Sequence, residues 1–183
     1  MFQRGQEEAP FQLLVAVILM TFVIIVGLNA MQEAEKQKCV NQTEKAMNDF
    51  KLALEKTANN KNPSNVKFNP PGCTKTESFQ IKKFDDQRIC TRVCETSSST
   101  CVLLRYSTSE VTGIDDKCIN IGYDTQFRYY SDGTNECPEK QGFHGTPVDS
   151  VQGLEQGLYQ FLYSDFPGRT YSVVCSYVKD SGV

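Results

Sequence analysis

The sequence predicts an α+β protein, in which a long N-terminal hydrophobic helix is followed by a small, disulfide-stapled, mainly antiparallel β domain. Three observations support this fold class. Residues 11–28 form an apolar run without any charge, and residues 29–58 contain neither proline nor glycine. The remainder alternates short runs of β-forming residues with turn residues. All eight cysteines follow the apolar run, so we expect cross-links to hold the second part together.

Length and composition fit one domain of ordinary size plus an appendage. The chain has 183 residues, of which 39% are hydrophobic and 22% are charged, and its formal net charge is −3. This balance is typical of a folded protein rather than a disordered one. No block of lysine and arginine is present that could follow a phosphate backbone, so we expect no nucleic-acid partner.

The cysteine pattern favours disulfides in an oxidising compartment. Zinc sites usually contain a C-x2-C pair and often histidine, whereas the closest pair here is Cys90 and Cys94 and the only histidine is His144. We therefore expect no metal ion and no cofactor. Eight cysteines allow about 105 complete pairings, so the connectivity stays open. The cysteines are Cys39, Cys73, Cys90, Cys94, Cys101, Cys118, Cys137 and Cys175.

The apolar run, FQLLVAVILMTFVIIVGL, is long enough as a helix to cross most of a hydrocarbon layer of about 30 Å. Three interpretations compete: a cleaved secretory signal, a single-pass anchor, and a helix that leaves the membrane to pack in a filament. A secretory signal has a shorter apolar region and a basic region before it. Here Glu7 and Glu8 precede the run, and no A-x-A site follows it.

We expect the helix to begin near Ala9 or Pro10, because proline is tolerated in the first turn and the preceding acids favour the positive end of the helix dipole. Good helix formers dominate residues 29–58, and Asn59 to Pro63 provide a stop signal. The second half carries one apolar stripe at three- and four-residue steps, formed by Val40, Thr43, Met47, Phe50 and Leu54.

The first residues show a recognisable order: Arg4, Gly5 and Gln6, then polar residues, then the apolar helix from Phe11. This pattern resembles the N-terminus of archaeal type IV pilin-like proteins, which carry class III signal peptides. The resemblance covers about residues 1–58. It implies a membrane-inserted precursor, cleavage between Gly5 and Gln6 by a leader peptidase, and assembly by dedicated machinery into an extracellular filament of identical subunits.

Many proteins of that family have glutamate at the fifth position after cleavage, where this chain has Pro10. Glu7 and Glu8 are therefore expected to neutralise the new amine of Gln6. The resemblance also implies a filament core made of the apolar helices, for which the candidate residues are Phe11, Leu14, Ile18, Phe22 and Ile25. The expected organisation is a leader at 1–5, a helix at 6–58, a connector at 59–72 and a head domain at 73–183.

Short strands are expected throughout the head domain. We expect a hairpin of residues 88–95 and 101–107 around the polar tip at 96–100, with Cys94 and Cys101 close enough to pair. In the last strand, Tyr171, Val173, Cys175 and Tyr177 should share one face. The fold would be a sandwich or a sheet laid on the long helix. The further candidate strands are 119–123, 126–130, 157–164 and 170–178.

No constellation of residues indicates an enzyme. His144 lies between glycines near Asp149, without an evident nucleophile, so we interpret it as a loop residue. The pairs at 85–86 and 115–116 lack the spacing of a calcium loop. Asn41 begins an N-glycosylation tripeptide. We therefore expect a filament subunit; the alternatives are a membrane-anchored binding or adhesion domain and, less favoured, a secreted enzyme.

Overall fold

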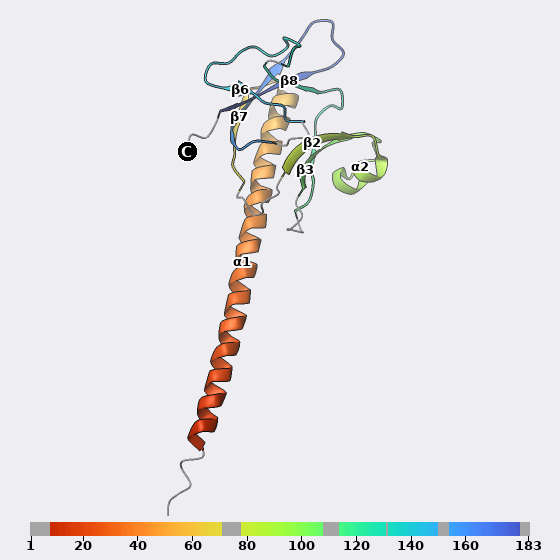
Figure 1. The fold of residues 1–183 in the computed structure, drawn as a ribbon. Helices are drawn as coiled ribbons and strands as arrows, with labels where there is room; N and C mark the ends of the chain where they lie inside the picture. Colours follow the sequence, from red (N-terminus) through yellow and green to blue (C-terminus); the bar gives the residue numbers. More distant parts are fainter. Residues whose placement is uncertain (1–7, 71–77, 108–113, 131, 150–153, 180–183) are drawn as a thin grey trace, which may run out of the picture. The chain divides into compact units, whose positions relative to one another are not determined.

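The computed structural model describes residues 8–70, 78–107, 114–130, 132–149 and 154–179. The chain divides into two compact units, Met1–Cys39 and Val40–Val183, and each is described by itself. Helix α1 (Glu8–Asn60) begins in the first unit and continues into the second, as Figure 1 shows. Its bounds confirm the prediction of one uninterrupted helix to within two residues at either end. Lys61, at a φ of 58°, and Pro63 end it.

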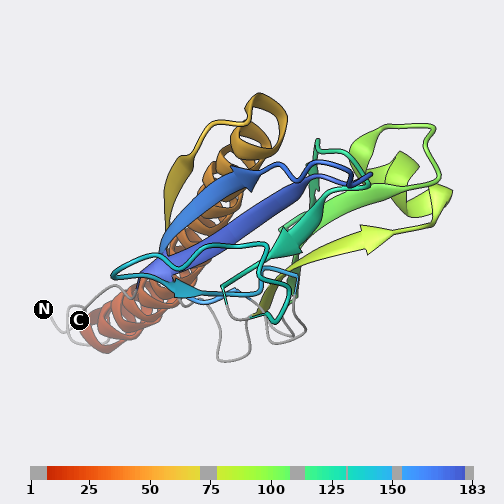
Figure 2. The ribbon, with the colours of Figure 1, turned by 90° about the horizontal axis from the view of Figure 1, so that it is seen from above.

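The second unit contains a five-stranded and a three-stranded sheet (Figures 1 and 2). The larger has the order β1-β7-β8-β5, and β6 also pairs with β8; the smaller has the order β2-β3-β4. All pairs are antiparallel except β5 with β8, which is parallel. The strands are β1 (Ser64–Phe68), β2 (Ser78–Phe84), β3 (Cys101–Ser107), β4 (Lys117–Ile119), β5 (Gln126–Arg128), β6 (His144–Gly145), β7 (Gly157–Ser164) and β8 (Val173–Lys179).

The predicted stripe on the second half of α1 forms the centre of the main core. Thr43, Met47, Phe50 and Leu54 are completely buried. The Phe50 ring lies 5.0 Å from the ring of Phe68 on β1, and 5.1 and 5.3 Å from those of Tyr159 and Phe161 on β7, all edge to face. The larger sheet is thus laid on this part of the helix, as Figure 2 shows from above.

Strand β8 is buried on both faces. Val174 and Val178 belong to the main core, whereas Val173, Cys175 and Tyr177 form a second cluster with Cys137. Tyr171 packs against this second cluster, which confirms that these alternating residues share a face. The strand begins three residues later than the predicted 170. Its hairpin partner β7 has the predicted bounds.

The predicted strand at residues 88–95 is wrong, because this segment forms helix α2 (Gln87–Cys94). The Asp86 carboxylate accepts a hydrogen bond of 2.8 Å from the Arg88 N–H, which caps the helix start. Ile89, Cys90, Val93 and Cys94 lie at helical spacing and pack against the outer face of the smaller sheet. Glu95, at a φ of 51°, ends the helix.

Cys94 and Cys101, which we expected to lie close enough to pair, belong to one cluster but bond to other cysteines. The helix brings both its cysteines to one face, where Cys90 bonds to Cys101 and Cys94 bonds to Cys118. A third disulfide joins Cys137 to Cys175 on β8. Cys39 is disulfide-bonded as well, and Cys73 lies outside the described residues. No cysteine of the described part of the chain is free, as expected.

Other boundaries of the prediction need correction. The expected connector at 59–72 contains strand β1, whose Ser64 hydroxyl donates a 2.6 Å hydrogen bond to the Ala53 carbonyl of α1. Strand β2 was not predicted from the sequence. The expected strands at 119–123 and 126–130 are each shorter, as β4 and β5. In all these places the strand is only three to seven residues long, too short for a clear alternation.

Candidate functional site

The feature of this protein that most needs a function is the first half of α1. Fourteen large apolar side chains lie between Phe11 and Leu28, and each exposes 38% to 69% of its surface. The expected core residues Phe11, Leu14, Ile18, Phe22 and Ile25 are all among them, with exposed fractions of 68%, 56%, 59%, 64% and 53%. A helix that is apolar on every side is stable only when lipid or other protein surrounds it.

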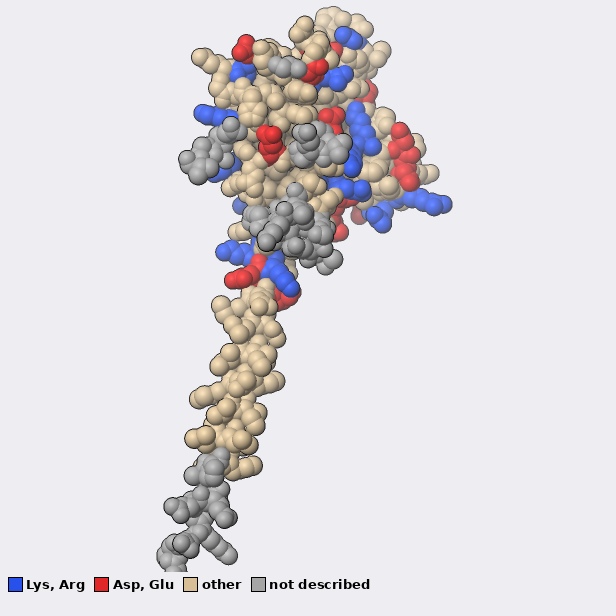
Figure 3. Space-filling model, viewed as in Figure 1, with Lys and Arg blue, Asp and Glu red and all other residues tan. Residues whose placement is uncertain are grey.

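This stretch satisfies its own backbone. Every residue from 8 to 60 is α-helical, so the N–H groups beyond the first turn bond within the helix. The one hydroxyl of the apolar run, on Thr21, donates a 2.8 Å hydrogen bond to the Val17 carbonyl one turn earlier. By length and composition the helix can cross a membrane. In Figure 3 its apolar part carries no acidic or basic side chain.

The apolar surface ends in a band of charge. Glu33, Glu35, Lys36 and Lys38 are all exposed and belong to the same unit as the apolar run. Because charged side chains are costly in hydrocarbon, this band limits the part of α1 that can be immersed in lipid or in a dry protein bundle. Eighteen helical residues before the band correspond to about 27 Å.

The residues expected to control processing fall outside what the structure describes. Gly5, Gln6 and Glu7 precede the first described residue, and Glu8 is described only as the start of α1. Cleavage between Gly5 and Gln6, and neutralisation of the new amine by Glu7 and Glu8, therefore stay predictions. Asn41 lies on the exposed surface of α1, where its side chain is accessible to solvent.

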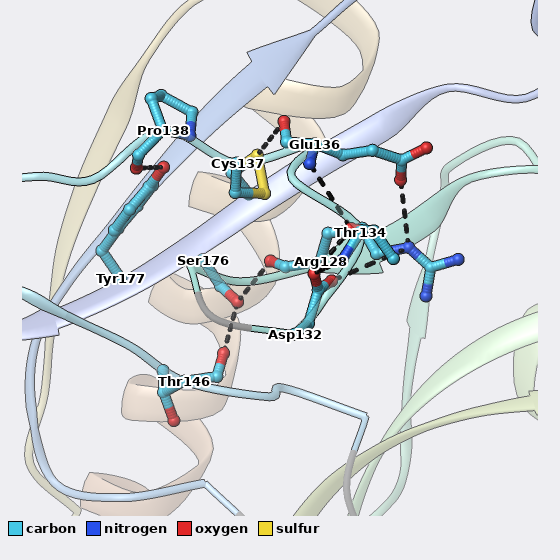
Figure 4. The surroundings of a disulfide bond; sticks show 10 residues. Arg128, Asp132, Thr134, Glu136, Cys137, Pro138, Thr146, Ser176 and Tyr177 are labelled. Atoms are coloured by element: carbon cyan, nitrogen blue, oxygen red, sulfur yellow. Dashed lines mark hydrogen bonds and ion pairs between the residues drawn. A yellow bond between two sulfur atoms is a disulfide. The ribbon is translucent and has the colours of Figure 1, made fainter.

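A buried carboxylate cluster lies beside the disulfide of Cys137 in the second unit, as Figure 4 shows. The Glu136 side chain, 5% exposed, accepts hydrogen bonds from Arg128 Nε at 3.2 Å and from the Tyr171 hydroxyl at 2.8 Å. Arg169 lies 3.3 Å from the same carboxylate. The hydrogen bond to Glu136 raises the pKa of Tyr171. Since Glu136 is fully paired, we interpret the cluster as a structural tie between β5, β8 and the segment joining them.

Asp132 belongs to the same cluster. Burial alone would raise its pKa, but hydrogen bonds from the Thr134 hydroxyl at 2.6 Å and the Thr134 N–H at 2.8 Å outweigh that effect, and the pKa is lowered. Arg128 adds a charge 3.9 Å from the other carboxylate oxygen. This cluster was not predicted from the sequence, although acidic residues close to a cysteine in a turn-rich segment were a possible signal.

The other candidate groups have structural partners. His144 on β6 is exposed and lies 3.5 Å from Glu155. Asp85 accepts a hydrogen bond from Tyr123, and Asp116 pairs with Arg105 at 2.8 Å. Within the described ranges, no group of three or more histidine, cysteine or acidic residues could hold a metal ion.

Lys83 on β2 is a half-buried lysine whose contacts hold a loop. Burial lowers the pKa of Lys83 on β2, whose ammonium donates hydrogen bonds to the carbonyls of Tyr123 and Thr125. These contacts fix the loop after β4 against β2. Both acceptors are backbone carbonyls, so we assign Lys83 a role in holding the loop.

Comparison of the chain with protein-family models, with curated proteins and with solved structures found no match.

Proposed function

We propose that this chain is the structural subunit of a type IV pilin-like extracellular filament, in which the first halves of α1 from many copies form the core. The observation that carries the proposal is the exposure of all fourteen large apolar side chains between Phe11 and Leu28 on an uninterrupted helix. The disulfides are consistent with an oxidising, extracytoplasmic location.

The energetics are consistent with a helix that needs partners. Removing fourteen such side chains from water is worth on the order of 25–30 kcal/mol per subunit, at about 2 kcal/mol each. Lipid also hides these side chains, so transfer from membrane to filament gains little hydrophobic free energy. Helix packing and contacts between second units must therefore decide that step. Contacts that repeat without closing produce an open helical polymer.

The order of residues at the N-terminus favours a filament subunit over a permanently anchored protein. Cleavage between Gly5 and Gln6 would place a free amine beside Glu7 and Glu8, and these are the only acids before Glu33. In a dry helix bundle the amine needs a carboxylate partner, and these two are close in sequence. A permanently anchored protein has no need of this arrangement.

The test combines microscopy with determination of the N-terminal residue. Cells producing the chain should carry filaments composed of it, and the subunit should begin at Gln6, free or cyclised. Ile24→Arg should abolish the filaments, because an unpaired charge in lipid or among packed helices costs several kcal/mol. Ile24→Leu, which keeps the apolar volume, is the matched control and should leave their yield unchanged.

Three results would contradict the proposal. Filaments formed at normal yield by Ile24→Arg would show that the helix is not the core. An intact Met1 on protein that stays in the membrane would identify an anchored binding or adhesion domain. An N-terminus near Met31 would identify a cleaved secretory signal.

A further inference from the structure

A half-open cavity of about 560 Å³ lies in the second unit. Its walls come from the second half of α1, from the segment between α2 and β3, and from β4 with the loop after it. We propose that this cavity binds a saccharide unit that carries a carboxylate group. The residues that carry the proposal are Lys51, Thr96, Ser98, Thr100, Asn120 and Tyr123.

Among the described residues that line the cavity, Lys51 is the only charged one. Its ammonium forms an ion pair with Glu55 Oε1 at 3.9 Å, a separation that is too long for a hydrogen bond. That same oxygen already accepts a hydrogen bond from the Asn120 N–H. The lysine therefore retains donors for a ligand, and a carboxylate is the acceptor that binds an ammonium most strongly.

The segment before β3 supplies hydroxyl donors. Thr96 Oγ1 accepts a 3.3 Å hydrogen bond from the Ser98 N–H, and Ser98 Oγ accepts one of 3.2 Å from the Thr100 N–H. A hydroxyl that accepts from the backbone still has its own hydrogen to donate. The hydroxyls of Ser98 and Thr100 lie 3.4 Å apart, so one of them donates to the other. Thr96 and one further hydroxyl are left to bond an oxygen-rich ligand.

Tyr123 and Asn120 complete the recognition surface. The Tyr123 hydroxyl donates to Asp85 at 2.8 Å, so the ring, 39% exposed, offers the ligand an apolar surface rather than a donor. A pyranose ring has C–H faces that pack on such aromatic surfaces. The Asn120 backbone is held to α1 by Glu55 and by Asn59 at 2.7 Å, while none of the described residues bonds its side-chain amide.

The cavity is formed before any ligand binds. The disulfides of Cys90 with Cys101 and of Cys94 with Cys118 fix both ends of the hydroxyl-bearing segment. A site whose walls are already ordered loses less entropy on binding than a flexible one. Its volume lies within the range of about 300–1,000 Å³ that is usual for small-molecule sites. The inference does not depend on polymerisation, because every residue involved belongs to one copy.

The test is an NMR titration of the full chain in detergent micelles, with D-glucuronate and with D-glucose as the neutral analogue. Glucuronate should shift the amide signals of the 96–100 segment and of Asn120 saturably. Glucose should bind at least about tenfold more weakly, because it lacks the charged acceptor. Lys51→Gln should weaken glucuronate binding by about tenfold, whereas Lys82→Gln, an exposed lysine outside the cavity, should leave it unchanged.

A second pair of variants tests the aromatic surface. Tyr123→Phe retains the ring and should bind glucuronate nearly as well as the parent chain, whereas Tyr123→Ser should lose most of the binding. Equal affinity for glucose and glucuronate would overturn the role of the charge. Absence of saturable shifts with glucuronate, or binding that survives both Lys51→Gln and Tyr123→Ser, would overturn the site itself.

Discussion

Residues 11–28 and residues 40–60 belong to the same helix, yet their apolar side chains meet opposite environments. In the first stretch, no large apolar side chain exposes less than 38% of its surface. In the second, Met47, Phe50 and Leu54 are completely buried against the two sheets. The backbone is helical throughout, so the difference comes from the side chains alone.

The distribution of apolar residues around the helix explains the difference. Between residues 40 and 60 they recur at three- and four-residue steps and form one stripe, which the sheets cover from one side of the helix. Between 11 and 28 they occupy every face, which no single sheet can cover. One helix can therefore both anchor a domain and present a surface that requires lipid or further copies.

The largest expected effect distinguishes the two halves directly. Phe50→Ala should destabilise the second unit by about 3–5 kcal/mol, because it removes a buried ring that contacts three other aromatic rings. Unfolding by urea, followed by tyrosine fluorescence of the full chain in micelles, measures this change. The chain has eight tyrosines and no tryptophan, which makes that signal specific.

The matched control is Phe22→Ala in the exposed half. Phe22 is 64% exposed, so its truncation should change the free energy of unfolding of the second unit by less than about 0.5 kcal/mol. Similar losses of stability in both variants would show that the apolar half packs against the domain, and the contrast between the halves would then be lost.

The disulfides should give the next largest effect. The bond between Cys137 and Cys175 closes a separation of 38 residues, and that between Cys90 and Cys101 closes one of 11. Loop-closure entropy predicts stabilisation of about 4 and about 3 kcal/mol, respectively. Replacing each pair by serine and measuring urea unfolding tests both values. The apolar run at residues 11–28 lies outside these loops, so insertion into the membrane should persist in both variants.

An alkylation experiment provides the control for that interpretation. Under denaturing, non-reducing conditions, mass spectrometry of the parent chain should find no modified cysteine. Labelling at two or more positions would remove the basis for the comparison, since the second unit would then be held by packing alone.

Much of the fold follows from local patterns in the sequence. The apolar run, the stripe on α1 and the strands β3 and β7 depend on composition and on periodicity within a few residues, and the structure confirms them. Helix α2 was not predicted because its eight residues, which include Cys90 and Cys94, match a strand by length. The signal that could have identified it was Asp86 as a cap, followed by apolar residues at helical rather than alternate spacing.

The exposed apolar surface and the cavity also differ in whether the sequence could predict them. The exposed apolar surface could be predicted from composition, because a run that is apolar on all faces has no polar side to offer water. The saccharide cavity could not, because Lys51, Thr96 and Asn120 come from three separate segments. Disulfide pairing also depends on that tertiary arrangement: once residues 87–94 are helical, Cys94 faces β4 rather than the tip of a hairpin.

The smallest expected effect is on the pH dependence of the stability of the second unit. It also distinguishes the two regions, because the apolar run contains no titratable side chain. In the second unit the lowered pKa of Asp132 stabilises the fold at pH values above the ordinary aspartate value of about 4. This contribution is lost as the pH falls through the lowered pKa of the folded state.

Asp132→Asn should therefore cost about 1 kcal/mol at pH 7 and reduce the dependence of stability on pH below 4. Asp49→Asn, at an exposed position on α1, is the control and should have little effect at either pH. Urea unfolding at pH 7 and pH 3 measures both variants. An equal cost of Asp132→Asn at the two pH values would show that the residue acts by its shape and not by its charge.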